Sequence, residues 1–556
     1  MNREWTAIEL NESFDLAKRK AWFMDGVHTI PRWPVHPLDH VWPKAERGLT
    51  WACERISHPQ CRGWMWRTRD GSAFLSPIMV TDPEERARRQ GPFSEALKPF
   101  IEDFRGLWDQ YKTKWEASWE KAFAFDIENA SDIDLEDFYR DLVLLEIENW
   151  KDHFYIMEGV GSLTLLFEDL ASELCGVNSS SPVWSKLCSG FESKAFESDA
   201  KMWELANAAK AAGLSPLFAS HSGQALVDQI KAAPQGDAFL AKVKAFLSEY
   251  GLRLVQLLNY ASPSWQERPD VVLDLISIFV TKDDAFLHET MKAKAVTERE
   301  EAERELLAKV PGDQKEWFQV LLSCAQNWGW WSEEHEFWLN EPTYCLLRRV
   351  MLEYGKRFVV AGTFDQVDDI FHIRELDFER VVHHPADFNL RPEVAKHRAE
   401  LAAFGSKETQ PVVSYDNIPG AVEWLMQMRE FHVALSMGYM PEPKEGVNAS
   451  LWGTCGCPGT AEGVARVVRS DEDLHDIQPG DIVVCPTTYV TWTPIFSMIG
   501  GLVVDRGGSL SHSAICSREY GVPCVMNTFT GTSQIKTGQK IKIQADIGAV
   551  FVANDS

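Results

Sequence analysis

Hydrophobic residues recur at helical spacing through most of the chain before residue 440. Between positions 100 and 119, large apolar residues stand three or four positions apart: Phe100, Phe104, Leu107, Tyr111, Trp115 and Trp119. This spacing predicts one long helix whose aromatic stripe faces a core. The same periodicity predicts further helices over 201–212, 236–251, 271–280 and 295–310. The N-terminal part of the protein is therefore expected to be mainly α-helical.

Another predicted helix places polar groups on its apolar face. It begins after Ser131, a good N-cap, and its apolar spacing continues onto Glu146, Asn149 and His153. Buried polar groups need partners, so this stripe is either a satisfied core network or one wall of a pocket. In the pocket alternative, His153 oriented by Glu146 is a candidate general base. Glu146 and Asn149 are then candidate substrate-binding residues.

The segment 327–338 is the densest aromatic and acidic stretch of the chain. Ser332 is expected to cap a helix that places an acid and an aromatic ring one turn apart on one side. Four of its residues are site candidates, Glu334 and His335 for catalysis and Trp331 and Trp338 for substrate binding. His372, in the segment 368–376, is a further catalytic candidate. An ordinary surface or capping role is the alternative for both histidines.

From residue 451 the pattern changes to short apolar strands separated by Pro-Gly and Gly-Gly turns. Strands are predicted over 464–468, 481–485, 502–504, 524–526, 541–544 and 550–552. We therefore predict a multidomain protein with a mostly α-helical, Trp-rich substrate-binding domain at 1–440, which can include an irregular subdomain at 1–90. A Pro-rich, charged hinge linker at 441–450 connects it to a C-terminal α+β domain of β/β/α layers at 451–556.

Composition narrows the class of protein. A hydrophobic content of 45% and a charged content of 25% are typical of a folded soluble protein, and the net charge of -26 argues against nucleic acid and anionic membrane as partners. No apolar run is long enough to span a membrane, and no signal peptide is recognised. The eleven cysteines lack disulfide-like spacing, which indicates a reducing cytoplasm. Neither Cys455 and Cys457 nor the histidines between 28 and 40 form a recognisable metal-ligand pattern, so no metal site is predicted.

One short helix in the C-terminal region carries the strongest chemical signal. Ser511 is a good N-cap and Gly521 a good stop, so His512 should lie in the first turn. The free N–H groups and the positive dipole end there favour an anion and disfavour a protonated histidine. His512 is thus suited to act as a neutral nucleophile that carries a phosphoryl group. The predicted phosphate-binding or supporting residues are Gly507, Gly508, Ser511, Ser513 and Arg518, although Arg518 is rotated away from His512 and can equally support structure.

The stretch 507–523, together with the flanking motifs at 479–484 and 501–504, resembles the swivelling phosphohistidine domain of the phosphoenolpyruvate-utilising enzymes. These include phosphoenolpyruvate synthase, pyruvate phosphate dikinase, rifampin phosphotransferase and phenylphosphate synthase. The resemblance covers roughly the last hundred residues and implies that His512 is the phosphorylated histidine. Two residues before the histidine, this chain has Leu510 where the dikinases carry Thr. The missing hydroxyl leaves open which groups contact the phosphoryl group, and it favours the phenylphosphate and rifampin branch of the family.

A phosphohistidine needs a phosphoryl donor, and the chain shows neither a P-loop nor a stretch resembling an ATP-grasp module. We therefore expect a split enzyme of the phenylphosphate synthase type, in which a separate ATP-grasp subunit uses ATP and Mg²⁺ to phosphorylate His512. The acceptor is expected to be a small aromatic alcohol such as phenol or cresol, bound by the helical domain. The alternatives are half of a rifampin-phosphotransferase-like antibiotic-modifying enzyme and a non-catalytic phosphorelay or regulatory protein. His153, His335 and His372 remain alternatives for the general base.

Overall fold

The computed structural model describes residues 22–24, 41–69, 72–255, 259–280, 288–404, 412–413, 441–469 and 471–553. The chain forms two compact units, each built from separate stretches of sequence. Unit 1 comprises Met1–Ser162, Leu258–Ala261 and Trp338–Glu430, and unit 2 comprises Leu163–Leu257, Ser262–Phe337 and Phe431–Ser556. The histidines between 28 and 40 lie outside the described residues.

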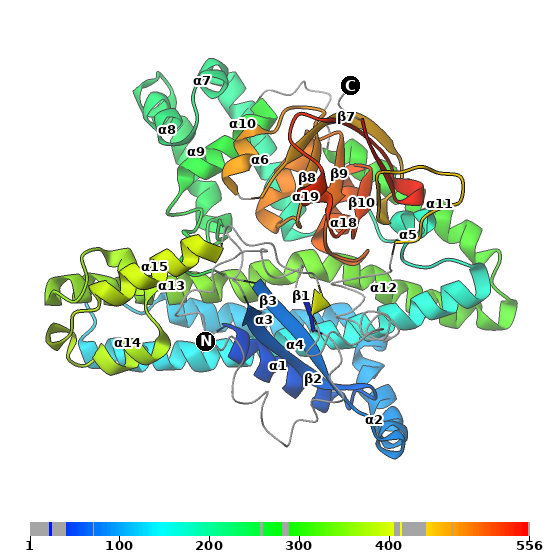
Figure 1. The fold of residues 1–556 in the computed structure, drawn as a ribbon, viewed down its shortest axis with the longest axis horizontal. Coiled ribbons are helices and arrows are strands. Elements are labelled where there is room, and N and C mark those ends of the chain that lie inside the picture. Colours follow the sequence, from blue (N-terminus) through cyan, green and yellow to red (C-terminus); the bar gives the residue numbers. More distant parts are fainter. Residues whose placement is uncertain are drawn as a thin grey trace. The chain divides into compact units, whose positions relative to one another are not determined.

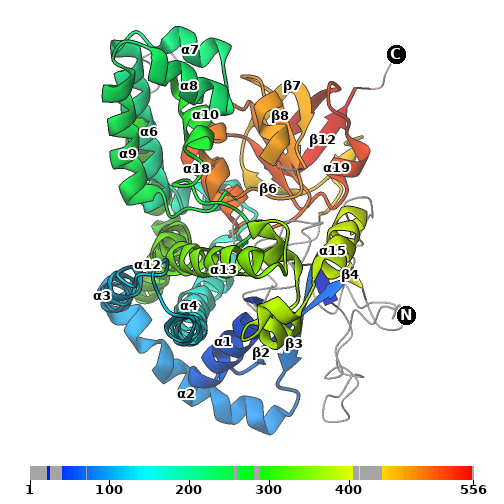
Figure 2. The same ribbon diagram turned by 90° about the vertical axis from the view of Figure 1, so that its left-hand side faces the viewer.

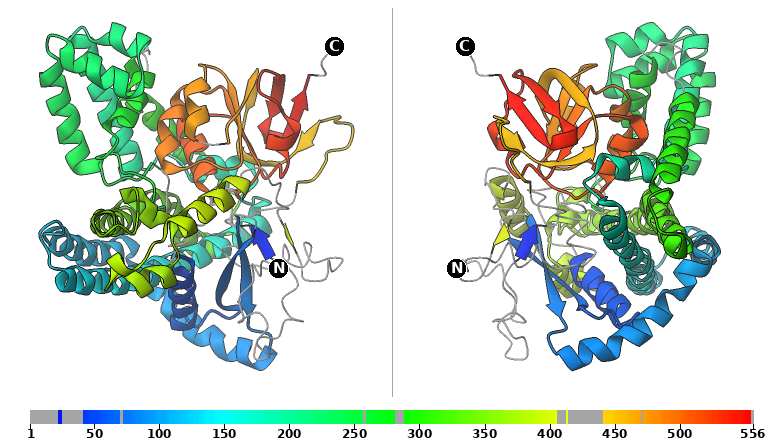
Figure 3. Two further views of the ribbon diagram at one scale, coloured as in Figure 1. Left: turned by 60° about the vertical axis from the view of Figure 1, so that its left-hand side comes forward. Right: turned by 90° about the vertical axis from the view of Figure 1, so that its right-hand side faces the viewer.

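Unit 1 contains a four-stranded antiparallel sheet with the strand order β2-β3-β1-β4. The bounds of its strands are β1 Trp22–Met24, β2 Cys61–Arg69, β3 Ser72–Met79 and β4 Val412–Val413. The two long strands β2 and β3 form a hairpin beside helix α1 (Val41–Arg55), as the blue ribbons of Figure 3 show.

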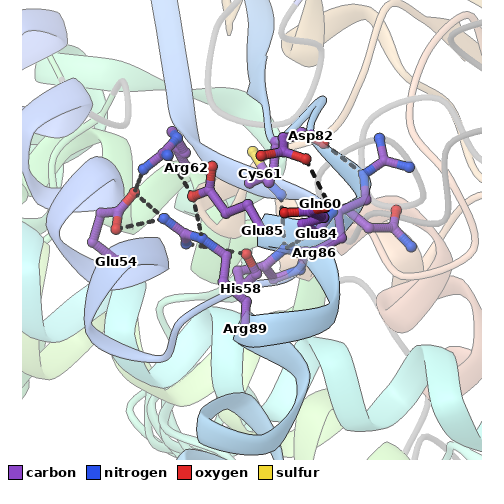
Figure 4. A network of polar contacts seen from close by, with 11 residues as sticks. Glu54, His58, Gln60, Cys61, Arg62, Asp82, Glu84, Glu85, Arg86 and Arg89 are labelled. Atoms are coloured by element: carbon purple, nitrogen blue, oxygen red, sulfur yellow. Dashed lines mark hydrogen bonds and ion pairs between the residues drawn. The ribbon is translucent and has the colours of Figure 1, made fainter.

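A polar cluster joins α1, β2 and the start of α2 (Pro83–Glu102) within unit 1 (Figure 4). The buried guanidinium of Arg89 donates to both carboxylate oxygens of Glu54 at 2.7 Å and to Glu85 at 2.9 Å. It also donates to the carbonyl oxygen of His58 at 3.2 Å. Arg62 adds a further donor to Glu54 at 2.9 Å. The cluster therefore fixes the N-terminal half of α2 against the sheet.

The prediction of one long aromatic helix over 100–119 is wrong, because the chain breaks at Asp103. Helix α2 ends at Glu102 and α3 spans Phe104–Phe123. Asp103 has the non-helical dihedrals φ -157° and ψ 74°, and its side chain accepts a hydrogen bond from the Gly106 N–H at 2.9 Å. Asp103 thus acts as the N-cap of α3, and this cap marks the start of a second helix. The apolar stripe still faces the core, through Phe100, Phe104, Trp108, Trp115 and Trp119.

Helix α4 (Asp132–Cys175) begins where the sequence predicts. The Ser131 hydroxyl accepts the Asp134 N–H at 3.2 Å, as expected for an N-cap. The boundary between the two units falls within this helix, at Ser162 and Leu163. The remaining helical elements of unit 1 are α13 Glu341–Ala361, η5 Val367–His372, α14 Glu375–Val381, η6 Pro385–Asp387 and α15 Arg391–Phe404.

The helical part of unit 2 contains the four further helices predicted from periodicity. Its elements are α5 Pro182–Leu187, α6 Lys194–Ala211, α7 Ser215–Ser220, α8 Gly223–Ala232, α9 Gly236–Tyr250, α10 Pro269–Val280, α11 His288–Leu307, η3 Gly312–Gln314 and α12 Lys315–His335. Helices α6 to α10 pack together (Figure 2) around a core that includes Trp265, Val272 and Ile276. None of the described helices is long and apolar enough to cross a membrane.

The expected N-cap at Ser332 is wrong. Ser332 lies inside α12, which continues to His335 and then passes into a π-helical turn, η4 (Glu336–Asn340). The buried Trp328 and Trp331 extend the apolar face of α12 through this region, so the helix has no reason to restart at Ser332.

The C-terminal region of unit 2 is built on a mixed eight-stranded sheet in the order β5-β12-β11-β7-β8-β9-β10-β6. Strands β7 to β10 are parallel in this order, and the other pairs are antiparallel. The bounds are β5 Leu451–Trp452, β6 Thr454–Cys457, β7 Thr460–Val467, β8 Ile482–Cys485, β9 Gly501–Val504, β10 Cys524–Met526, β11 Lys540–Gln544 and β12 Ala549–Val552. The six predicted strands are thus confirmed, and β5 and β6 were missed.

The two edges of this sheet are neighbours in sequence. Strands β5 and β6 are separated by Gly453 alone, so the sheet curls until its edges approach one another (Figure 3). Helix α18 (His512–Tyr520) follows β9 and lies near β10 (Figure 1). The short elements η7 Asp471–Asp476, η8 Val490–Ser497, α19 Gly531–Gln534 and η9 Ala545–Ile547 complete the region. An α+β region at the C-terminus of a mostly helical chain agrees with the predicted class.

Candidate functional site

Helix α18 places His512 at its first residue, as predicted. Ser511 is the N-cap with extended dihedrals, and Gly521 ends the helix in the left-handed conformation with φ 64°. The Ser511 hydroxyl makes no capping bond, and its buried oxygen has no hydrogen-bond partner among the described residues. The positive end of the α18 dipole therefore lies at His512.

The loop before α18 is tightly packed. Gly507 has φ 106°, which favours glycine, and a side chain there would meet the Ser511 hydroxyl at 3.0 Å. The carbonyl oxygen of Gly508 accepts the Ser511 N–H at 3.1 Å. Leu510, which stands where the dikinases carry Thr, is buried, and its carbonyl oxygen accepts the indole N–H of Trp328 at 3.2 Å. Position 510 thus fixes the loop on α12 and adds no hydroxyl.

A hydroxyl from another segment contacts the imidazole instead. The Oγ1 atom of Thr488 lies 2.9 Å from Nδ1 of His512 and 2.8 Å from the Ser513 hydroxyl. Ser513 in turn accepts the Thr488 N–H at 3.2 Å. If Nδ1–H donates to Thr488, the lone pair of Nε2 is left for chemistry. Thr488 and Ser513 therefore hold the ring on its Nδ1 side, and Nε2 lies on the opposite side.

Three side chains surround Nε2 of His512. The Cys516 Sγ lies at 3.2 Å, the Thr493 hydroxyl at 3.5 Å and a carboxylate oxygen of Glu333 at 3.6 Å. Cys516 is one turn further along α18, Thr493 lies in η8, and Glu333 is near the end of α12. Nε2 thus faces the helical part of unit 2.

Burial sets the protonation states of His512 and Glu333. It lowers the pKa of His512 to about 3, with the Arg253 guanidinium adding to the decrease. It raises the pKa of Glu333 to about 8, and the nearby Glu336 carboxylate raises it further. His512 is therefore neutral at pH 7, and Glu333 holds its proton there. The close approach of the two is a contact between neutral groups, which suits a nucleophilic imidazole.

The C-terminal turn of α18 is anchored to neighbouring segments of unit 2. The Arg518 guanidinium donates to the Gly456 carbonyl at 3.0 Å and to the Ser185 hydroxyl at 3.3 Å. The Glu519 carboxylate accepts the Gly190 N–H at 2.8 Å, and burial raises the pKa of this carboxyl to about 7. Arg518 therefore lies in a structural contact in this arrangement, and its predicted contact with phosphate stays a prediction.

Glu334 and His335 contact other residues and not His512. A carboxylate oxygen of Glu334 accepts the Lys194 N–H at 2.8 Å and so caps helix α6. The His335 ring stacks on Trp331, with centroids 4.3 Å apart, and its Nε2 lies 3.2 Å from Glu336. The carboxylate that meets His512 is therefore that of Glu333, one position before the predicted Glu334.

The predicted polar stripe of α4 is fully buried in unit 1. Glu146 pairs with the Lys44 ammonium group. The Asn149 amide donates to three acceptors of the following segment, within 3.1–3.3 Å: the Leu339 carbonyl, Asn340 and Thr343. Nδ1 of His153 lies 3.4 Å from the Asn340 amide. These contacts make the stripe part of a buried polar network, and its role in a substrate pocket stays a prediction.

The remaining candidates also lie in unit 1. His372 ends η5, and its carbonyl oxygen accepts the Nδ1–H of His397 at 2.7 Å. The Trp338 carbonyl accepts the indole N–H of Trp119 at 2.8 Å, and the Lys112 ammonium lies 4.0 Å from the centre of the Trp338 ring. A pocket of about 710 Å³ between the end of α3 and the start of α4 is lined by none of the predicted substrate-binding residues.

Sequence reasoning missed the four residues nearest to the imidazole. Cys516 could have been found, because it follows His512 by one helical turn. Thr488 and Thr493 lie in the Thr-rich stretch before β9, which carries no recognised spacing. Glu333 could not have been singled out, because only the packing of α18 on α12 brings it to His512.

Residues 477–548 match the family described as the PEP-utilising enzyme, mobile domain. The match contains His512 and the whole of α18. This part of the chain is therefore similar to the mobile domain of the PEP-utilising enzymes. A second match covers residues 153–333 and is described as the rifampicin phosphotransferase fourth domain. This second match includes Glu333, so the His512–Glu333 contact joins residues of the two matched regions.

Several curated proteins are similar to the chain. A protein called uncharacterized phosphotransferase YvkC, from Bacillus subtilis, is 25% identical over 73% of this chain and 48% of its own length. The prodigiosin synthesizing transferase PigC of Serratia marcescens is 28% identical over 61% of this chain and 36% of its own length. A rifampicin phosphotransferase of Streptomyces sviceus is 24% identical over 59% of this chain and 36% of its own length. The chain spans less than half the length of each relative. The matched regions are thus similar to parts of PEP-utilising enzymes and of phosphotransferases.

Proposed function

We propose that the chain is the phosphoryl-carrying and acceptor-binding part of a phosphotransferase, with Nε2 of His512 as the carrier atom. The observation that carries this proposal is the state of His512. Its Nδ1 contacts the Thr488 hydroxyl, its Nε2 faces the site, and burial lowers its pKa to about 3. A neutral imidazole at a helix N-terminus combines a free lone pair with a positive dipole for the phosphoryl anion.

In the charging step, the Nε2 lone pair attacks the phosphorus atom of the donor. The N–P bond forms as the P–O bond to the donor breaks, and the donor leaves as an anion. The proton on Nδ1 stays on the ring, in contact with Thr488. Thr488 therefore acts as a positioning residue that keeps Nε2 unprotonated.

In the transfer step, a substrate hydroxyl attacks the phosphohistidine. The O–P bond forms as the N–P bond breaks, and the hydroxyl proton passes to a general base. Glu333 is placed for this role in its ionised form, because its carboxylate oxygen lies 3.6 Å from Nε2. Burial raises its pKa to about 8, so this form is the minor one at pH 7, and the transfer step should become faster as the pH rises toward 8. This assignment replaces His153, His335 and His372 as our preferred base.

The phosphoryl donor in this proposal is ATP with Mg²⁺, handled by an ATP-grasp module, which we expect to be a separate subunit. The acceptor is a hydroxyl group on a small aromatic molecule of the phenol type. A second candidate acceptor is a larger rifampicin-like molecule. The match of residues 153–333 to a rifampicin phosphotransferase domain favours this second candidate.

The test is a two-step labelling experiment with the full chain. The chain is first incubated with ATP labelled in its phosphoryl groups and with candidate ATP-grasp proteins. The labelled chain is then separated from nucleotide and exposed to a panel of phenols and to rifampicin. Loss of label to one compound, with an equal amount of phosphorylated product, supports the transfer and names the acceptor class. Label that transfers only to another protein contradicts an acceptor site and supports a relay protein.

A further inference from the structure

We propose that Glu333, His512 and Cys516 form a binding site for a divalent transition-metal ion such as Zn²⁺. Nε2 of His512, Sγ of Cys516 and a carboxylate oxygen of Glu333 all lie within 4.8 Å of one another. His512 and Cys516 are four residues apart on α18, so the helix presents both on one face. Glu333 adds the third ligand from α12. Imidazole, thiolate and carboxylate are the ligands that Zn²⁺ takes in proteins.

Two of the three spacings between the ligand atoms are close to those expected around one ion. Nε2 is 3.2 Å from Sγ and 3.6 Å from the Glu333 oxygen. Zinc bonds are about 2.0–2.1 Å to nitrogen or oxygen and about 2.3 Å to sulfur, so tetrahedral ligand atoms stand roughly 3.3–3.6 Å apart. Three protein ligands leave the fourth position for solvent.

An independent observation is the state of the Glu333 carboxyl group. Glu333 is 3% exposed, and the oxygen that faces His512 makes no hydrogen bond with any of the described residues. A buried polar atom without a partner is costly, and a cation at this point is a partner for it. Nδ1 of His512 lies 2.9 Å from the Thr488 hydroxyl, so with Nε2 bound to the ion a hydrogen on Nδ1 would have the outer-shell acceptor that metal-binding histidines usually have.

Charge and protons balance in the binding step. The ion displaces one proton from the Cys516 thiol and one from the Glu333 carboxyl group, and both protons go to solvent. The resulting thiolate and carboxylate offset the two charges of the ion. The Arg253 guanidinium nearby opposes the ion, and the Glu336 carboxylate favours it.

The metal ion and the phosphoryl group compete for one lone pair, that of Nε2. This consequence rests on the proposed function. Zn²⁺ therefore inhibits the charging of His512, and the phosphorylated chain does not bind the ion. The same residues that keep the nucleophile ready make it sensitive to transition metals.

Cobalt(II) is the probe for the site, because it replaces Zn²⁺ and is visible in absorption. The reduced full chain is titrated with Co²⁺. We expect one equivalent to give visible bands together with a near-ultraviolet band from thiolate to cobalt. Cys516→Ser should lose the near-ultraviolet band, and Glu333→Gln should weaken Co²⁺ binding by at least about tenfold. Thermal unfolding of each variant confirms that it is folded.

Two matched variants serve as controls. Cys324→Ser removes a buried thiol of α12 that lies outside the proposed site, and Glu334→Gln alters the carboxylate next to Glu333. Both should bind Co²⁺ as the wild type does. Absence of the thiolate band in the wild type, or its survival in Cys516→Ser, would overturn the site.

A second measurement separates the metal site from the proposed function. Phosphorylation of His512 is measured with Zn²⁺ and after removal of Zn²⁺ by a chelator. Inhibition that the chelator reverses supports the competition. Phosphorylation of His512 without a Co²⁺ thiolate band overturns the metal site alone. A Co²⁺ site in a chain that no donor phosphorylates overturns the proposed function and leaves the metal site standing.

Discussion

Two buried polar regions, one in each unit, contain a histidine and a carboxyl group, and they differ in how the carboxyl group is neutralised. In unit 1, Glu146 is paired with the Lys44 ammonium, close to the His153 network. In unit 2, Glu333 faces a neutral His512, and burial raises the Glu333 pKa to about 8. The first region is an ion pair that holds helices together. The second keeps an acid and a nucleophile in neutral forms, which is what a reactive site needs.

The largest effect should come from breaking the ion pair of unit 1. Lys44→Ala leaves the fully buried Glu146 without its cation, and we expect a loss of about 3–5 kcal/mol in the free energy of unfolding. Chemical denaturation measures it. Lys114→Ala is the matched control, because Lys114 is half exposed and its partner Asp152 keeps a hydrogen bond from the Trp115 indole N–H at 3.0 Å. A loss under about 1 kcal/mol is expected there. Equal losses in both variants would contradict the structural role of the Lys44 pair.

The next effect concerns the acid of unit 2. The folded protein keeps a proton on Glu333 up to about pH 8, whereas the unfolded chain releases it near pH 4.5. Stability should therefore fall as pH rises through this window, by up to about 1.4 kcal/mol per pH unit. Glu333→Gln removes this contribution, so its unfolding free energy should depend less on pH.

The window from pH 7 to pH 8 isolates Glu333 from the histidine. His512 has its pKa lowered from 6.5 to about 3 on folding, so it is mostly neutral in both states above pH 7. Denaturation at several pH values compares the wild type with Glu333→Gln and with the control Glu334→Gln. A parallel pH dependence in the wild type and Glu333→Gln would show that Glu333 is ionised in the folded state.

A smaller effect tests the orientation of the nucleophile. Thr488→Val removes the hydroxyl that contacts Nδ1, so the tautomer with a free Nε2 lone pair is no longer favoured. We expect phosphorylation of His512 to slow by about 10-fold to 100-fold. Rapid-quench labelling measures the rate. Thr487→Val changes the neighbouring buried threonine and should slow it less. Equal rates in Thr488→Val and the wild type would remove Thr488 from the mechanism.

The smallest effect should appear at the start of α4. Ser131→Ala removes the hydroxyl that accepts the Asp134 N–H, and we expect a loss of about 1 kcal/mol in unfolding free energy. His512 phosphorylation per folded molecule should not change, because Ser131 supports only the helix that carries the unit 1 network. A change in the labelling rate of the folded variant would show that the two regions are coupled.

The fold could be predicted where local pattern decides it. The six C-terminal strands and the helix that begins at His512 follow from strand periodicity, turn residues and caps. The break at Asp103 was missed, because the apolar spacing continues across it and a single capping side chain decides the outcome. Strands β5 and β6 were missed, because they are only two and four residues long, which is too short to show a periodic pattern.

The site could be predicted only along its own helix. His512 and the glycines before it were found from sequence, since they are contiguous and have a characteristic order. Glu333 and Thr488 reach the imidazole through packing between distant segments, which periodicity does not encode. The same reason explains why no metal site was predicted, because the proposed ligand set draws on two helices.

The most direct test of the account is the position of the phosphoryl group on the charged protein. Phosphopeptide mapping under alkaline conditions, combined with ³¹P and ¹⁵N NMR of the intact chain, identifies both the residue and the nitrogen. We expect one acid-labile, base-stable phosphoryl group on Nε2 of His512, which is absent in His512→Ala. A phosphoryl group that persists in His512→Ala, or one attached to Nδ1, would contradict it.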